Sequence, residues 1–163
     1  MEFLDIDTRI QQLLRAASSY YDMPFSPPKV LLDLTGADAG QAISEDNLLR
    51  FNQEFYRHNR NHFVHHIVAH ETAHLVAQKV YGHTIAAHGR EWQGVMNRVF
   101  YVPATCKHNY DLRQSSRYRF IYGCRCSKRE TPLSAIRHNR KKRGVVYFCG
   151  DCGARYRFLY EAI

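Results

Sequence analysis

The chain has 163 residues, of which 23 are Lys or Arg and 15 are Asp or Glu, so its formal net charge is +8. This length is sufficient for one hydrophobic core and a small appendage. The acidic amino terminus lacks a continuous apolar run and no 18-residue apolar stretch occurs, so we expect neither a signal peptide nor a membrane span. An odd number of cysteines, five, argues against a disulfide framework, and we expect a cytoplasmic protein.

The amino-terminal part is predicted to contain one helix and three short strands. Apolar residues recur at helical spacing over Thr8–Tyr21, and three prolines between residues 24 and 28 then break the chain. Strands are predicted over Val30–Leu34, Gln41–Ile43 and Leu48–Asn52. We expect them to form a small antiparallel sheet that packs on the helix that follows.

The next predicted helix carries the most informative motif. Residues 61–81 contain no Pro or Gly, have apolar residues at helical spacing, and precede Gly82, which ends the helix. Within it, His70, Glu71 and His74 form an H-E-x-x-H motif. The two histidines project from one face and can bind a single Zn²⁺, and the glutamate is placed to deprotonate a water there. Because unpaired imidazoles are costly to bury, this inward-facing pair favours a metal site.

A catalytic zinc requires a third protein ligand. A second amphipathic helix, with Trp92 on its apolar face, is predicted from about His88 to Tyr101. The reversal between the two helices places the start of the second against the end of the first, which favours His88. Glu91 and His83 are the alternatives, and Glu91 is also explained as a first-turn carboxylate that complements the helix dipole.

This set of residues resembles the SprT-like metallopeptidase family. Beyond the two motif helices, the resemblance rests on five further segments: Asn47–Asn52, Val102–Ala104, Tyr122–Cys126, Arg137–Arg140 and Cys149–Gly153. It implies that His88 completes the zinc ligands with His70 and His74. It also implies that Glu71 is the general base, and that the substrates are proteins bound or crosslinked to DNA, as in DNA–protein crosslink repair.

The carboxy-terminal third contains two cysteine pairs among predicted strands. Those strands cover Tyr118–Tyr122, Ala135–Asn139, Val145–Phe148 and Tyr156–Tyr160, and the middle two are predicted to pair across a basic turn. Cys124-x-Cys126 and Cys149-x-x-Cys152 on neighbouring hairpins predict a zinc ribbon, a structural site with all four positions filled. Because C-x-C is tighter than the usual spacing, His138 is an alternative to one cysteine of the first pair.

The charge is concentrated in this third. Residues 1–106 carry 9 basic and 11 acidic residues, whereas residues 107–163 carry 14 and 4. This asymmetry of charge predicts that residues 107–163 bind a polyanion. The alternative explanation is a basic surface that is only solvated. The predicted basic hairpin holds the candidate nucleic-acid-binding residues, Arg137, Arg140, Lys141, Lys142 and Arg143. Aromatic residues that alternate with basic ones can stack on unpaired bases, so we expect DNA that is single-stranded or bound without sequence specificity. Association with the nucleoid would follow.

The sequence therefore predicts an α+β protein with an H-E-x-x-H, zincin-like helical core and a small antiparallel sheet over residues 1–106. A basic linker and a β zinc ribbon are predicted over residues 107–163. The expected cofactors are one catalytic and one structural Zn²⁺, and the expected activity is a zinc endopeptidase. The competing hypothesis is a non-catalytic zinc-containing nucleic-acid-binding protein, against which the glutamate of the motif argues, because a structural site needs no base. A metal hydrolase that acts on a non-protein bond is a weaker competitor.

Overall fold

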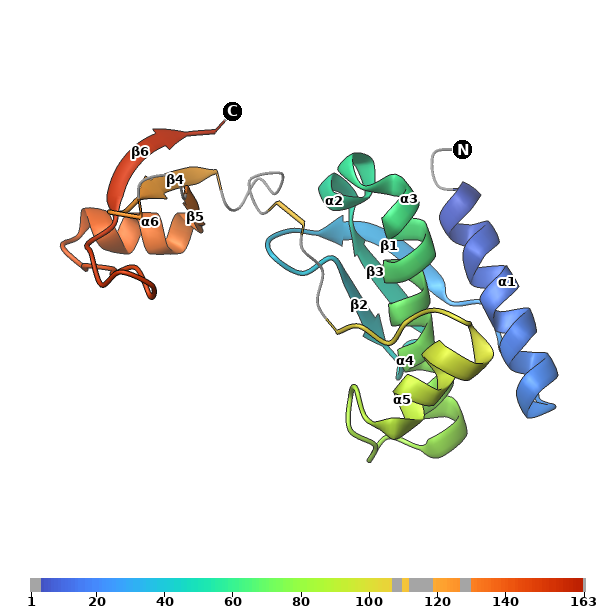
Figure 1. Cartoon of the computed structure of the whole chain (residues 1–163). Coiled ribbons are helices and arrows are strands. Elements are labelled where there is room, and N and C mark those ends of the chain that lie inside the picture. Colours follow the sequence, from blue (N-terminus) through green and yellow to red (C-terminus); the bar gives the residue numbers. More distant parts are fainter. Residues whose placement is uncertain (1–3, 107–109, 112–118, 127–129, 163) are drawn as a thin grey trace. The chain divides into compact units, whose positions relative to one another are not determined.

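The chain forms two compact units in the computed structural model (Figure 1). The structure describes residues 4–106, 110–111, 119–126 and 130–162. The first unit comprises residues 1–34 and 38–109, and the second comprises residues 35–37 and 110–163. Helices and small sheets occur in both, which confirms the predicted α+β class. The predicted domain boundary after residue 106 stays a prediction. None of the described helices has the length and apolar character needed to cross a membrane.

Helix α1 (Leu4–Tyr21) packs its apolar face on helix α4 (Val68–Tyr81) of the first unit. The predicted helix is confirmed, and its buried residues follow helical spacing: Ile6, Ile10, Leu13, Leu14 and Ala17. Near its start, Asp5 accepts hydrogen bonds from the Tyr56 hydroxyl and the Arg60 guanidinium, both at 2.7 Å. Burial alone would raise the pKa of Asp5, but these bonds lower it below its ordinary 3.8. The carboxylate thus ties α1 to the helical segment that precedes α4.

The sheet of the first unit is mixed, with strand order β1-β3-β2. Strands β2 (Gly40–Ile43) and β3 (Leu48–Asn52) form an antiparallel hairpin, whereas β1 (Lys29–Leu34) pairs with β3 in parallel. The prediction of an antiparallel sheet is therefore wrong for β1. The connection after β1 reverses the chain and the hairpin reverses it again, so β3 runs in the direction of β1. Strand β2 is left at the edge, where it packs against α4.

One nearly continuous helical segment follows the sheet. Asn52 begins it by accepting hydrogen bonds from the backbone N–H groups of Glu54 and Phe55, at 3.1 and 3.3 Å. The segment then consists of α2 (Gln53–His58), α3 (Arg60–His62), a π-helical turn (Phe63–Ile67) and α4. Gly82, with φ 88°, ends α4, a backbone conformation that favours glycine. The predicted helix over residues 61–81 is confirmed, with the π-helical turn near its start.

The second predicted helix of this unit is also confirmed. It begins as α5 (Arg90–Gly94) and continues as a π-helical turn (Val95–Val99). Its apolar face is buried in the core and comprises Trp92, Val95, Met96 and Val99. Figure 1 shows α5 beside α4, so that the helix that carries His70 and His74 lies next to the helix that His88 precedes.

The second unit is built on a three-stranded antiparallel sheet with the order β5-β4-β6. Its strands are β4 (Phe120–Gly123), β5 (Thr131–Leu133) and β6 (Arg157–Glu161). The predicted strands over residues 118–122 and 156–160 correspond to β4 and β6, although Tyr118 lies outside the described residues. Ile121 and Tyr122 of β4 are buried, which gives this unit a small core of its own.

The predicted hairpin between residues 135 and 148 is wrong. Residues 135–142 form helix α6 (Ala135–Lys142), and Phe148 forms an isolated antiparallel bridge with Arg155. Ser134 caps the helix by accepting a hydrogen bond from the backbone N–H of Arg137 at 3.4 Å. His138 of the helix is buried and stacks on the ring of Phe120, with centroids 3.8 Å apart. The tertiary contact and the cap thus outweigh the short alternation that the sequence shows.

Candidate metal centres

Three histidines come together in the first unit. His70 and His74 lie one turn apart on α4, and His88 lies immediately before the start of α5. The Nε2 atom of His70 lies 3.0 Å from Nε2 of His88 and 3.3 Å from Nε2 of His74. The ligand atoms of all three lie within 4.8 Å of one another. The structure thus brings together the three histidines that the sequence proposes as one ligand set.

The spacing of these nitrogens suits a metal ion. Nitrogens bound tetrahedrally at about 2.0–2.1 Å from Zn²⁺ lie about 3.3 Å apart. His70 and His74 are half-buried and His88 is exposed, so the cluster is accessible from one side. Burial, together with the neighbouring His70 and His88, lowers the pKa of His74 to about 3. A neutral imidazole is the form that binds a metal.

The indole of Trp92 supports all three imidazoles. Its ring centroid lies 4.6 Å from that of His70, 5.5 Å from His74 and 4.7 Å from His88. Its Nε1–H donates a hydrogen bond to the backbone carbonyl of His70 at 3.2 Å, and the side chain is fully buried. The sequence placed Trp92 only on an apolar face. Its position in the first turn of the helix that follows His88 is the signal that could have identified it as a support for the cluster.

Glu71 follows His70 on α4 and lies in a buried environment beside the sheet. The pKa of Glu71 is raised to about 8 from its ordinary 4.5, mainly by burial and to a smaller extent by the negative charge of Asp38. A hydrogen bond from the backbone N–H of Ala42 opposes this rise. The carboxyl group is therefore held by edge strand β2 and can exist in either protonation state near neutral pH, as a group that accepts and returns a proton requires.

Gly40 makes the close approach of Glu71 to β2 feasible. A Cβ atom at residue 40 would lie 2.5 Å from Cγ of Glu71 and 2.7 Å from its Oε1, well inside an ordinary contact. Sequence analysis did not select Gly40 or Ala42. A glycine at the start of an edge strand indicates close packing, but the partner is known only from the fold.

His83 and Glu91, the two alternatives to His88 as the third metal ligand, lie outside this cluster. Nδ1 of His83 lies 3.3 Å from Oε1 of Gln78, at the end of α4. Glu91 lies in the first turn of α5, as the dipole explanation expects. Within the described part of the chain, neither residue is a member of a group of three or more potential ligands.

Four cysteines form a second cluster in the second unit. The sulfur atoms of Cys124, Cys126, Cys149 and Cys152 all lie within 4.8 Å of one another, and those of Cys126 and Cys149 are 3.9 Å apart. All four are free thiols rather than disulfides. Sulfurs bound tetrahedrally to Zn²⁺ at about 2.3 Å lie about 3.8 Å apart, so the cluster has the size and the donor atoms of a closed four-thiolate site.

The backbone of the second cysteine pair favours a thiolate. Backbone N–H groups of Cys152 and Asp151 lower the pKa of Cys149 to about 6. Gly153, with φ 66°, donates its N–H to the carbonyl of Cys149 at 2.9 Å and closes the turn. The alternative ligand His138 faces elsewhere, because its Nδ1 lies 2.8 Å from the hydroxyl of Tyr122.

The candidate nucleic-acid-binding residues lie on a helix rather than on the predicted hairpin. Arg137, Arg140, Lys141 and Lys142 belong to α6, and Arg143 is the residue at its carboxy-terminal cap. Lys141 lies over the ring of Tyr122, with its Nζ atom 5.7 Å from the ring centroid. Because these basic residues are distributed around one short helix, only some of them can face the same ligand.

The fold and the two clusters define a protein with one open three-histidine centre and one four-cysteine centre, each with the donor atoms of a metal site. Residues 10–108 match the model of the SprT-like family, and the chain belongs to this family. It is 41% identical over 147 residues to a protein named Protein SprT from Pseudomonas fluorescens Pf0-1, covering 90% of each chain. It is 36% identical over 159 residues to the Protein SprT of Pseudomonas aeruginosa UCBPP-PA14, covering 97% of this chain and 96% of the relative. No solved structure matches the chain.

Proposed function

We propose that the protein is a zinc-dependent endopeptidase in which Glu71 acts as the general base. One observation carries the proposal: the carboxyl group of Glu71 is buried and directly follows the first histidine of an accessible three-histidine cluster. The backbone of β2 holds this carboxyl group by a hydrogen bond. A site with a purely structural role has no use for a proton acceptor at this position. The first unit then corresponds to a zincin-like core and the second to a zinc ribbon.

The chain's own residues supply positioning and proton transfer. His70, His74 and His88 would hold a zinc ion, which supplies Lewis acidity that activates water and polarises a carbonyl group. Glu71 accepts a proton from the attacking water and then donates it to the amine that leaves when the peptide bond breaks. The hydrogen bond from Ala42 keeps its carboxyl group oriented during both transfers. Trp92 keeps the three imidazoles in place.

We further propose that the substrates are proteins bound or crosslinked to DNA. The support is the basic second unit, in which α6 carries four consecutive cations at its end: Arg140, Lys141, Lys142 and Arg143. Such a cluster neutralises phosphates without reading the sequence of bases. A single-stranded or sequence-nonspecific DNA partner would then place the peptidase unit beside proteins on the same DNA. The ribbon cysteines would hold a second zinc ion for stability.

The test is a cleavage assay with two substrates, a DNA-binding protein and an unstructured peptide, each with and without DNA. The expected result is cleavage of both by the zinc-loaded protein, its loss on treatment with a chelator, and its return on addition of zinc. DNA should accelerate cleavage of the DNA-binding protein more than cleavage of the peptide, because only the former shares the DNA with the enzyme.

Two outcomes would separate the parts of the proposal. Binding of DNA without cleavage of either substrate, by protein that contains zinc, would favour the non-catalytic nucleic-acid-binding alternative. Cleavage that DNA does not change would retain the endopeptidase and remove the proposed substrate class.

A further inference from the structure

A second pair of histidines lies on the helical segment that carries the H-E-x-x-H motif. His62 is the last residue of α3, and His66 lies four residues later in the π-helical turn. Their rings stack with centroids 5.1 Å apart and planes inclined by 30°. The ring centroids of His70 and His74 are 5.0 Å apart. The earlier pair thus repeats both the sequence spacing and the ring separation of two histidines that can share one ion.

The helix geometry separates this pair from two other histidines nearby. His58 precedes His62 by four residues, but Asn59, with φ −132°, ends α2 and begins α3 between them, so the helical face is interrupted there. His65 is adjacent to His66 in the sequence, and side chains one residue apart on a helix do not face each other. His65 is therefore a matched control for the pair.

The pair is open to solvent on one side, since His62 is exposed and His66 is half-buried. The pKa of His66 is below its ordinary 6.5, mainly because of burial and to a smaller extent because of the neighbouring His62, although a hydrogen bond with Thr105 opposes the shift. A neutral imidazole is the form that binds a metal. Two protein ligands leave the remaining coordination positions of an ion to water.

Thr105 selects which nitrogen of His66 is available to an ion. Its hydroxyl oxygen Oγ1 lies 2.6 Å from Nε2 of His66. When Nε2 carries the ring proton and donates it to this hydroxyl, Nδ1 keeps its lone pair for an ion. A metal-ligating histidine usually donates its other ring N–H in this way. The backbone N–H of Ala104 donates to Oδ1 of Asn97 at 3.0 Å, which holds the segment that carries Thr105.

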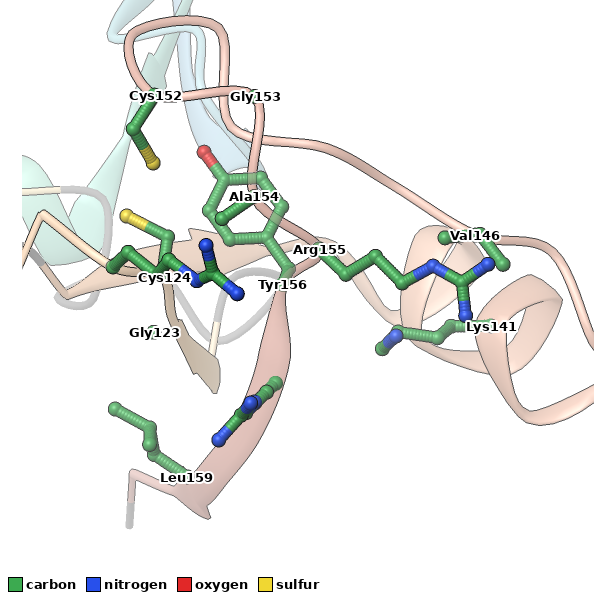
Figure 2. A pocket seen from close by; sticks show the side chains of 12 residues that line it. Gly123, Cys124, Lys141, Val146, Cys152, Gly153, Ala154, Arg155, Tyr156 and Leu159 are labelled. Atoms are coloured by element: carbon green, nitrogen blue, oxygen red, sulfur yellow. The ribbon is translucent and has the colours of Figure 1, made fainter.

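The large pocket of the second unit is not a competing site for a cation. It lies beside the four-cysteine cluster and is lined by four cationic side chains: Arg125, Lys141, Arg155 and Arg157. Figure 2 shows Arg155 and Lys141 among the side chains that line it. Its described lining residues include neither a carboxylate nor an imidazole, and the positive charges repel a divalent ion.

We propose that His62 and His66 bind a further transition-metal ion, of the class that imidazole ligands suit: Zn²⁺, Ni²⁺ or Cu²⁺. The hard cations Mg²⁺ and Ca²⁺ prefer oxygen ligands and do not fit. The site has one ligand fewer than the three-histidine centre, so it binds more weakly and fills last. Desalting empties it, and metal analysis of the purified protein still finds the two tightly bound ions. The proposal goes beyond the proposed function and does not depend on peptidase activity.

The first test is a calorimetric titration of Zn²⁺ into the full chain that already holds its two zinc ions. The wild type should bind one further ion, and Mg²⁺ should not replace it. His62→Ala and His66→Ala should each weaken this binding by more than about tenfold, since a lost ligand costs at least as much as the about 10–100-fold of a lost orienting partner. The control His65→Ala should bind the further ion like the wild type.

A wild type that binds no further ion with a Kd below about 1 mM would overturn the proposal. A further ion that His66→Ala retains, or that His65→Ala loses, would also overturn it, because the ion would then lie elsewhere. Retention of the two tight zinc ions and of thermal stability shows that each variant is folded. His62 is exposed, so His62→Ala keeps the proposal falsifiable if His66→Ala fails to fold.

The second test identifies the ligand nitrogens in the wild type by NMR of the imidazole rings, which reports the nitrogen that carries the proton. Added Zn²⁺ should shift the ring signals of His62 and His66, with Nε2 of His66 protonated, and leave those of His65 in place. Ring signals of His66 that do not respond would overturn the site. Thr105→Val keeps the shape but removes the hydroxyl, and it should weaken binding of the further ion by about 10–100-fold. Unchanged affinity in this variant would overturn the orienting role of Thr105.

Discussion

Gly40→Ala should disable Glu71 without removing the metal. The added Cβ would lie 2.5 Å from Cγ of Glu71 and 2.9 Å from its Cδ, whereas ordinary contacts begin near 3.4 Å. The glutamate side chain must therefore move by about 1 Å, and a misplacement of about 1 Å at a reacting group can lower a rate by about 10²-fold. Strand β2 should keep its pairing with β3, and the three atoms nearest the added Cβ all belong to Glu71.

The assay is kcat/KM for an unstructured peptide, measured alongside zinc content and thermal stability. We expect a loss of about 100-fold with full zinc content. The control is Gly150→Ala, a position where an added Cβ meets nothing within 4 Å, and it should cleave like the wild type. Near-wild-type cleavage by Gly40→Ala would refute the argument that β2 positions the base, and loss of zinc would show that the change acts through the histidines instead.

Three further predictions concern the metals and the first helix. Metal analysis should find two zinc ions per chain in the wild type, and His74→Ala and Cys149→Ser should each lose one of them. A wild-type protein that holds at most one zinc ion would contradict the assignment of two centres. His88→Ala should lose the zinc of the first unit whereas Glu91→Ala retains it; the reverse result would make the glutamate the third ligand. Asp5→Asn should lower the free energy of unfolding by about 1 kcal/mol at pH 7, because it loses charge-assisted bonds at a partly exposed site. Since the folded pKa of Asp5 is lowered, this stability difference should be full above pH 3.8 and disappear as the pH falls through the folded pKa, which urea unfolding at several pH values would check.

Local sequence patterns predicted most elements of the first unit, because each has a strong local cause. The H-E-x-x-H helix lacks Pro and Gly over 21 residues, and its end at Gly82 follows from the backbone conformation of that glycine. The parallel pairing of β1 could not be predicted in the same way, because a strand's alternation specifies its buried face and not its neighbour. The approach of Gly40 to Glu71 depends on how β2 packs on α4, which the alternation of a strand does not specify either.

The second unit shows where local patterns are ambiguous. Residues 135–139 contain apolar and polar residues in a short alternation, and only the cap at Ser134 and the burial of His138 against Phe120 select a helix. The cysteine spacing predicted which four thiols would meet, because a four-ligand site constrains the chain more strongly than propensity does.

The most direct test of the central claim is cleavage by Glu71→Gln at full zinc content. The substitution keeps the size and shape of the side chain but removes its capacity to accept a proton. The account predicts that kcat/KM falls by about 10²–10⁴-fold while the protein retains both zinc ions and its thermal stability. Glu91→Gln, the matched control on α5, should cleave like the wild type. Near-wild-type cleavage by a contaminant-free Glu71→Gln protein would contradict the proposed mechanism.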